Sequence, residues 1–199
     1  MVQKHLVLKI LKYLIMKTTF FTIALFIFII SCKAQTYPLR TFTEIPENAY
    51  LKDTNNELQY YVGTWKGTWN NKTIYITFKK MTNQYNPNLK YYKDFLIGKF
   101  KVVDSNGQIL FDNTSISDND AKMTGGKFRK ADDKYSLGYI DPDICNMMGS
   151  ILINFTSPTK TQMLFTFSDW TDIITPDCPY YNSNPFPEPL PKNIILAKQ

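Results

Sequence analysis

Residues 61–80 read YVGTWKGTWNNKTIYITFKK, and they contain two alternating runs of apolar and polar residues. The first run has Tyr, Gly, Trp, Gly and Trp at its odd positions, and residues 72–80 have Ile, Ile and Phe at even positions. Such alternation is typical of strands with one buried face. Because Asn tolerates positive φ, Asn70-Asn71 suits a two-residue hairpin turn between the two strands.

That turn predicts the register of the hairpin. It pairs four positions of the first run with four of the second: Trp69 with Lys72, Gly67 with Ile74, Trp65 with Ile76, and Gly63 with Phe78. In this register the apolar side chains share one face, and both glycines lie opposite large side chains. A slip by one residue would move each side chain to the other face, so the pattern strongly specifies the pairing.

Strand-like runs continue through most of the chain. They cover residues 91–103, 108–111, 126–130, 134–140, 151–156, 163–167 and 193–197. The runs are closely spaced, are separated by turn residues, and show no convincing period of 3.6. They predict an all-β, lipocalin-like fold, a single antiparallel barrel or sandwich of about eight to nine strands. A closed sheet would also remove exposed strand edges.

The N-terminal region predicts export and lipidation. Residues 20–30 form an apolar run of 11 residues, whereas a membrane-spanning helix needs about 20. Lys12 and Lys17 flank the run, which suits a signal peptide over residues 1–31. The sequence IISC at 29–32 resembles a lipobox, so we expect cleavage before Cys32 and acylation of its thiol. The alternative is a short membrane anchor with an incidental cysteine, and Met16 is an alternative start.

These features divide the chain and predict its location. Residues 32–58 form a lipidated N-terminus, tether and leading segment, and residues 59–199 form the barrel domain. Acyl chains on Cys32 would anchor the protein stably to a membrane of the cell envelope. Lys33 stands where an Asp often retains lipoproteins in the inner membrane, so we expect the outer membrane. Oligomeric state is not indicated.

A Pro-rich strap covers residues 176–191, PDCPYYNSNPFPEPLP. Six prolines exclude a central strand there. We favour a segment that crosses one end of the barrel and closes that end with Tyr180, Tyr181 and Phe186. The alternative is a Pro-rich ligand that is presented to the aromatic groove of a partner.

Charge and cysteine usage narrow the class further. The chain has a net charge of +6, but without residues 1–31 it keeps 19 basic and 17 acidic residues. A near-neutral mature protein lacks the basic footprint of a nucleic-acid binder. With Cys32 lipidated, Cys145 and Cys178 remain in a compartment where disulfides persist. We favour a disulfide between them over two buried thiols.

Several segments resemble an uncharacterised bacterial lipoprotein family, the domain-of-unknown-function family 6705. These are ISCKAQTYPL, NAYLKDTNNEL, YVGTWKGTW, IDPDIC, ITPDC and the final PLPKNIILAKQ. The resemblance covers nearly the whole mature chain and implies location, not chemistry. Gly63-Thr64-Trp65 is also similar to the first strand of lipocalin-like barrels. Lipocalins usually place a late Arg against that Trp, whereas the final strand here offers only lysines.

The sequence of the expected mature chain excludes the catalytic mechanisms that depend on histidine. The only histidine is His5, in the segment we expect to be removed, so the mature protein lacks the usual general base for neutral pH. Asp141 and Asp143 could act as a carboxylate pair in a hydrolase, and Asp118 and Asp120 could bind Ca²⁺. We favour turn chemistry for both pairs. We therefore predict a protein that is not an enzyme and has no cofactor or metal.

A binding role is the favoured hypothesis. Inward glycines in a Trp-rich first strand would leave room for an apolar small molecule or lipid inside the barrel. Its ligand-binding residues would be Gly63, Trp65, Gly67, Trp69, Ile76 and Phe78. For these side chains themselves, core packing is the favoured interpretation, with Trp65 in the core and Trp69 at the rim. The alternative function is an envelope interaction protein that uses its surface loops or the strap to bind protein or glycan.

Overall fold

A computed structural model describes residues 13, 15–19, 35–170 and 174–199, in two compact units, Met1–Gln35 and Thr36–Gln199. Of the first unit, residues 13 and 15–19 are helical. Most of the expected signal peptide and Cys32 lie outside the described residues, so cleavage and lipidation stay predictions. Among the described residues, no helix combines the length and hydropathy needed to cross a membrane.

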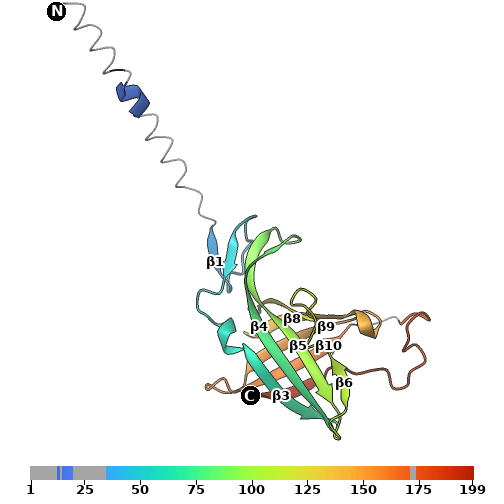
Figure 1. The fold of residues 1–199 in the computed structure, drawn as a ribbon. Helices are drawn as coiled ribbons and strands as arrows, with labels where there is room; N and C mark the ends of the chain where they lie inside the picture. The colour runs from blue at the N-terminus through green and yellow to red at the C-terminus, as the bar shows by residue number, and fades with distance from the viewer. Residues whose placement is uncertain (1–12, 14, 20–34, 171–173) are drawn as a thin grey trace, which may run out of the picture. The chain divides into compact units, whose positions relative to one another are not determined.

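In the second unit, eight antiparallel strands close a barrel (Figure 1). They are β3(Gly63–Trp69), β4(Lys72–Asn86), β5(Tyr91–Val103), β7(Met123–Phe128), β8(Tyr135–Asp141), β9(Met147–Phe155), β10(Gln162–Asp169) and β11(Asn193–Lys198). Each of these eight strands pairs with the one named after it, and β11 returns to pair with β3. The prediction of an all-β antiparallel barrel is confirmed.

The first hairpin has the predicted register. Gly63 pairs with Phe78, Trp65 with Ile76 and Gly67 with Ile74. The turn residues Asn70 and Asn71 have φ of 43° and 60°, the left-handed values that asparagine tolerates. The period-two pattern therefore identified both the strands and their pairing.

Short elements surround the barrel: β1(Thr36–Pro38), β2(Tyr50–Lys52), β6(Ile109–Asp112) and the 3-10 helices η1(Leu58–Tyr60) and η2(Pro142–Ile144). One edge of the long strand β5 pairs in succession with β2, β7 and β6. β2 pairs with β5 in parallel, and β1 with β2, so the leading segment extends the sheet. Three-residue strands are too short to show a period, and the sequence analysis missed them.

The inner face of the barrel forms one core. Trp65, Phe100, Phe165 and Tyr139 are buried there, and 25 buried residues belong to the same hydrophobic cluster. An eight-stranded barrel encloses a space that side chains can fill.

The sequence predicted a strand over 126–130, but β7 covers Met123–Phe128 and has a register shift between Gly125 and Phe128. Gly125 and Gly126 lie at the start of that shift.

The disulfide between Cys145 and Cys178 is present, with Cα atoms 5.5 Å apart. A cross-link at a separation of 33 residues stabilises a fold by about 3–4 kcal/mol on the chain-entropy model. It ties the Pro-rich strap, brown-red in Figure 1, to the chain just after η2. Tyr180 and Phe186 pack against the core, whereas Tyr181 is about half exposed.

Candidate functional site

The residues predicted to bind a ligand inside the barrel are part of its packed core or its rim. Trp65, Ile76 and Phe78 are buried, and the Trp65 indole N–H donates to the Tyr61 carbonyl at 2.7 Å. Trp69 is half-buried, as its interpretation as a rim residue requires. Lys198 on the final strand lies over the Trp65 ring, 5.3 Å from its centroid.

The space beside the inward glycines is taken by neighbouring side chains. A Cβ at Gly67 would lie 2.7 Å from Ile194 Cδ1 and from Leu196 Cδ2. A Cβ at Gly149 would lie 2.4 Å from the Phe167 ring. These glycines therefore make room for large residues of adjacent strands. Ligand binding by the predicted interior residues stays a prediction. The physical reason for it was empty space beside the glycines, and there is no such space at Gly67.

A different feature lies where the barrel closes between β5 and β7. The two strands pair only at Ile97 with Thr124 and at Gly98 with Met123. Beyond these pairs, the Leu96 N–H donates a hydrogen bond, 3.2 Å long, to the hydroxyl of Tyr135, which is buried inside the barrel. Full burial raises the pKa of that phenol above its usual range, so it stays neutral. A side chain thus supplies the hydrogen bond that a neighbouring strand would otherwise make.

Lys93, on the outer face of β5, also bridges the junction of β5 and β7, which we call the seam. Its ammonium donates to the carbonyls of Gly125 at 3.0 Å and Gly126 at 2.9 Å, and only 7% of the residue is exposed. Burial lowers the pKa of Lys93 to about 8. Among the described residues, no carboxylate forms an ion pair with Lys93, and its Nζ lies 5.4 Å from the centroid of the Phe95 ring.

A cavity of about 510 Å³ opens beside Lys93. It lies between the leading segment and the outer face of the barrel at β5, β7 and β8. Its apolar walls come from Leu39, Phe42, Ile45, Leu51, Leu89, Tyr91 and Phe128, and its charged groups from Glu44, Lys93 and Lys127. A mainly apolar cavity of this size with a few convergent polar groups is typical of small-molecule sites.

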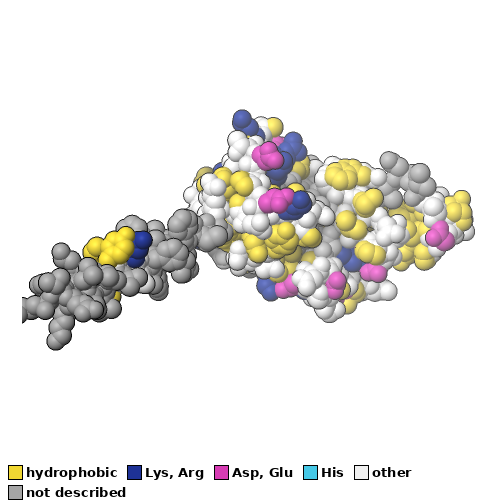
Figure 2. Space-filling view, turned by 90° about the horizontal axis from the view of Figure 1, so that it is seen from above, with side chains coloured by type: hydrophobic (Ala, Val, Ile, Leu, Met, Phe, Trp, Pro, Cys, Tyr) yellow, Lys and Arg dark blue, Asp and Glu magenta, His cyan; other side chains and the backbone are white. Residues whose placement is uncertain are grey.

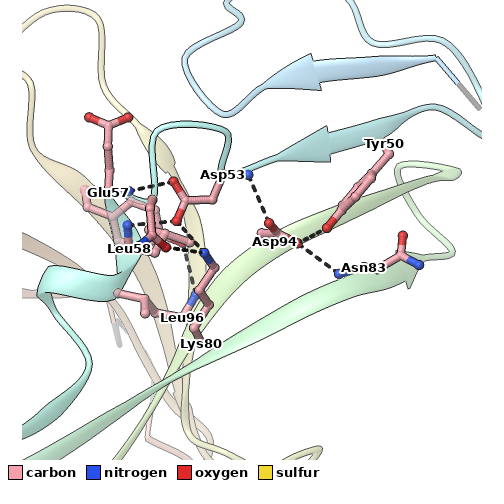
Figure 3. A network of polar contacts seen from close by, with 10 residues as sticks. Tyr50, Asp53, Glu57, Leu58, Lys80, Asn83, Asp94 and Leu96 are labelled. Carbon is pink, nitrogen blue, oxygen red and sulfur yellow. Dashed lines mark hydrogen bonds and ion pairs between the residues drawn. The ribbon is translucent and has the colours of Figure 1, made fainter.

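A buried polar network connects β2 and η1 to the barrel strands β4 and β5 (Figure 3). Asp94 on β5 accepts hydrogen bonds from the Tyr50 hydroxyl at 2.5 Å and from the backbone N–H groups of Asp53 and Asn83, both at 2.9 Å. Burial, together with this bond to Asp94, raises the pKa of the Tyr50 phenol. The network therefore fixes the end of β2 against β5.

Asp53 continues the network toward η1 (Figure 3). Its carboxylate accepts from the backbone N–H groups of Glu57 at 2.8 Å and Leu58 at 3.0 Å. It also forms an ion pair with Lys80 of β4 at 2.6 Å, and its side chain is fully buried. Because each of these polar groups has a partner, we assign the network a structural role: it positions the leading segment.

Asp141, the candidate for hydrolase chemistry, has structural partners. It accepts from the Tyr139 hydroxyl at 2.7 Å, from Lys122 at 2.5 Å and from the Asp143 backbone N–H at 3.0 Å. The last bond caps η2, which is the turn chemistry that the sequence favoured. A cavity of about 190 Å³ lies beside these groups. Lys122 forms ion pairs with both carboxylates; the Asp141 side chain is buried, whereas the Asp143 side chain is 81% exposed.

A third cavity, of about 280 Å³, is lined by residues that interact with one another. Arg40 forms ion pairs with Glu57 at 2.8 Å and with Asp133, while Tyr61 stacks on Phe155 with ring centroids 4.2 Å apart. Its charges are balanced within the protein, whereas Lys93 lacks an anionic partner among the described residues. The cavity beside Lys93 is therefore the candidate site.

Sequence reasoning missed this site. Lys93 stands in YYKDFLIGKFKVV, a strand that is apolar at most positions of both parities. A lysine and an aspartate side by side in such a strand are unusual, and that was the available signal. The leading segment that covers Lys93 has no period, so the burial could not be inferred.

Comparisons with known proteins agree with the family resemblance. The sequence model described as "Family of unknown function (DUF6705)" matches residues 16–199. No curated protein and no solved structure matches the chain, so the similarity to lipocalin-like barrels stays a prediction. Within the described ranges, no group of three or more metal-ligating side chains is found.

Proposed function

The chain belongs to this family of unknown function, and from its geometry we propose that it is a non-enzymatic binding module for an apolar small molecule or lipid. The cavity of about 510 Å³ beside Lys93 is the observation that carries the proposal. Binding takes place on the outer side of the barrel, under the leading segment, and not within the packed interior.

The surrounding structure suits a preformed site. The network of Asp53 and Asp94 fixes β2, and the barrel provides the opposite wall. A preformed cavity loses less conformational entropy when its ligand binds, which favours affinity. On the face seen in Figure 2, charges of both signs are interspersed with apolar groups, so no single-sign field points to a polyanionic partner.

The predicted export signal sets the location in this proposal. The apolar run over residues 20–30 and the cysteine at position 32 support a lipid anchor in the cell envelope, and we propose the outer membrane. A lipid-tethered binding domain meets its ligand close to a membrane surface. We propose no catalytic step, since the mature chain has no histidine and Asp141 is held by its structural partners.

The test uses an environment-sensitive dye such as ANS and the mature chain carrying Cys32→Ser, which contains the whole compact unit Thr36–Gln199. Phe42 lines the cavity and is 48% exposed, so Phe42→Ser should weaken dye binding about fivefold with little loss of stability. Ile109→Ser is the matched control, because Ile109 is 56% exposed and does not line the cavity. Dye binding that is absent, or equally affected by both substitutions, would contradict the proposal.

A second candidate function is contact with another envelope protein or a glycan at the end of the barrel near the disulfide. Ile140, Trp170 and Tyr181 are large apolar residues that are about half exposed or more there. A photo-crosslinking residue at Tyr181 should then capture a defined partner in cells, and one at the equally exposed Tyr85 should not. The same adducts at both positions, or none, would argue against this surface.

A further inference from the structure

We infer that the ligand of the cavity is a single-chain amphiphile with a carboxylate head, and that the Lys93 ammonium holds this head. The inference rests on the proposed function and adds the chemical class of the ligand. It starts from one buried cation on β5 that lacks an anion among the residues described.

The electrostatics of the cavity favour an anion. A lysine ammonium has three N–H groups, and Lys93 donates two hydrogen bonds, to the Gly125 and Gly126 carbonyls. Burying a charge without a counterion is costly, and a carboxylate beside the ammonium offsets part of that cost. The cavity lining contains a second positive charge, Lys127, and one acidic residue, Glu44, which is exposed.

The arrangement around Lys93 favours a single negative charge over a phosphate. Both hydrogen-bonded groups are carbonyl oxygens, which repel further oxygens of an anion. Phosphate sites usually offer guanidinium groups or several backbone N–H donors, whereas the backbone groups facing this ammonium are acceptors. One ammonium with one remaining N–H matches a carboxylate oxygen.

The walls favour an aliphatic tail on that head. Leu39, Leu51 and Phe128 are buried residues that line the cavity, and Phe42 and Leu89 continue the apolar surface outward. Each methylene removed from water contributes about 0.8 kcal/mol. A linear chain can pack against these apolar walls while its carboxylate reaches Lys93.

The experiment compares three ligands that share one tail: dodecanoate, dodecanol and dodecyltrimethylammonium. The two charged ligands are kept below their critical micelle concentrations, and dodecanol is kept below its solubility limit. Displacement of the dye is measured with the mature Cys32→Ser chain at pH 7. We expect dodecanoate to bind about ten- to a hundredfold more tightly than dodecanol, and the cationic ligand to bind most weakly. Lys93→Met should abolish the preference for dodecanoate while dodecanol still binds. Lys127→Met, at the exposed position, should change it less than about threefold.

A second measurement covers the case in which Lys93→Met does not fold, since Lys93 supports the seam. In the unsubstituted site, dodecanoate affinity should fall about tenfold per pH unit above pH 8, as Lys93 loses its proton, and dodecanol affinity should stay constant. The other titratable groups that line the cavity are Glu44, Tyr91 and Lys127; burial raises the pKa of Tyr91, which keeps it neutral in this range. Asp94 points to the opposite face of β5.

The outcomes separate the two proposals. Equal binding of dodecanoate and dodecanol would overturn the carboxylate inference and leave the proposed function in place. Failure of every ligand and of the dye to bind would overturn both. Tighter binding of dodecyl sulfate than of dodecanoate would show that the site selects another anion, and would also reject the inference.

Discussion

Replacing Asp53 with alanine is expected to lower the free energy of unfolding by about 3–5 kcal/mol. The carboxylate is fully buried and pairs with Lys80 at 2.6 Å, so its removal leaves a largely buried ammonium with no anion and only the Asn56 side-chain carbonyl, at 3.3 Å, as an acceptor. The backbone N–H groups of Glu57 and Leu58 also lose their acceptor. An unsatisfied buried donor costs about 1–3 kcal/mol. Urea unfolding followed by tryptophan fluorescence measures the loss.

The matched control for Asp53→Ala is Glu47→Ala. Glu47 pairs with Lys90 at 2.7 Å, but both side chains are more than half exposed, so its loss should cost less than about 1 kcal/mol. Asp53→Ala should also weaken dye binding at the cavity, because the leading segment would no longer be fixed against β5. Similar losses of stability in the two variants would show that the network of Asp53 and Asp94 does not hold the leading segment.

Gly125→Ala is expected to destabilise the barrel by about 2–4 kcal/mol, through overpacking and a lost hydrogen bond at the seam. A Cβ at this position would lie 2.2 Å from the Tyr135 hydroxyl and 2.8 Å from both the backbone N and O of Leu96. The backbone of β5 cannot move away without breaking its pairing with β4. Chemical unfolding again gives the loss directly.

Gly138→Ala is the control, because Gly138 lies on the neighbouring strand β8 and its Cβ would meet only the Thr124 carbonyl, at 3.9 Å. We expect a change within about 0.5 kcal/mol. Adding Tyr135→Phe to Gly125→Ala should recover part of the stability, since it removes the hydroxyl but leaves the contacts with Leu96. Equal stability of Gly125→Ala and Gly138→Ala would show that Gly125 does not lie as close to Tyr135 and Leu96 as described.

The strands of the barrel could be predicted because their signal is local. Ile74, Ile76 and Phe78 alternate with polar residues, and the two asparagines define the turn, so the register follows from a short segment. The same reasoning gave the final strand, which the structure places at Asn193–Lys198. The pair Cys145 and Cys178 followed from a count of cysteines and an expected compartment, and it is bonded.

The candidate site could not be predicted, because it depends on contacts between distant segments. Lys93 is buried by residues of the leading segment, and β2 has three residues, too few to show a period. The inward glycines suggested an empty interior, yet Ile194 and Leu196 of the last strand occupy the space beside Gly67. Which side chain fills the space beside a glycine is decided by strands that are far apart in sequence.

The sequence by itself determined the all-β class, the hairpin register and the pairing of Cys145 with Cys178, because each depends on local alternation or on counting a few residue types. Only the tertiary structure decided how the sheet closes: β5 meets β7 at two residue pairs, and Tyr135 and Lys93 complete the gap. Closure joins strands whose neighbours are set by the whole barrel. The cavity beside Lys93 forms where the leading segment packs over that closure, and no local pattern encodes it.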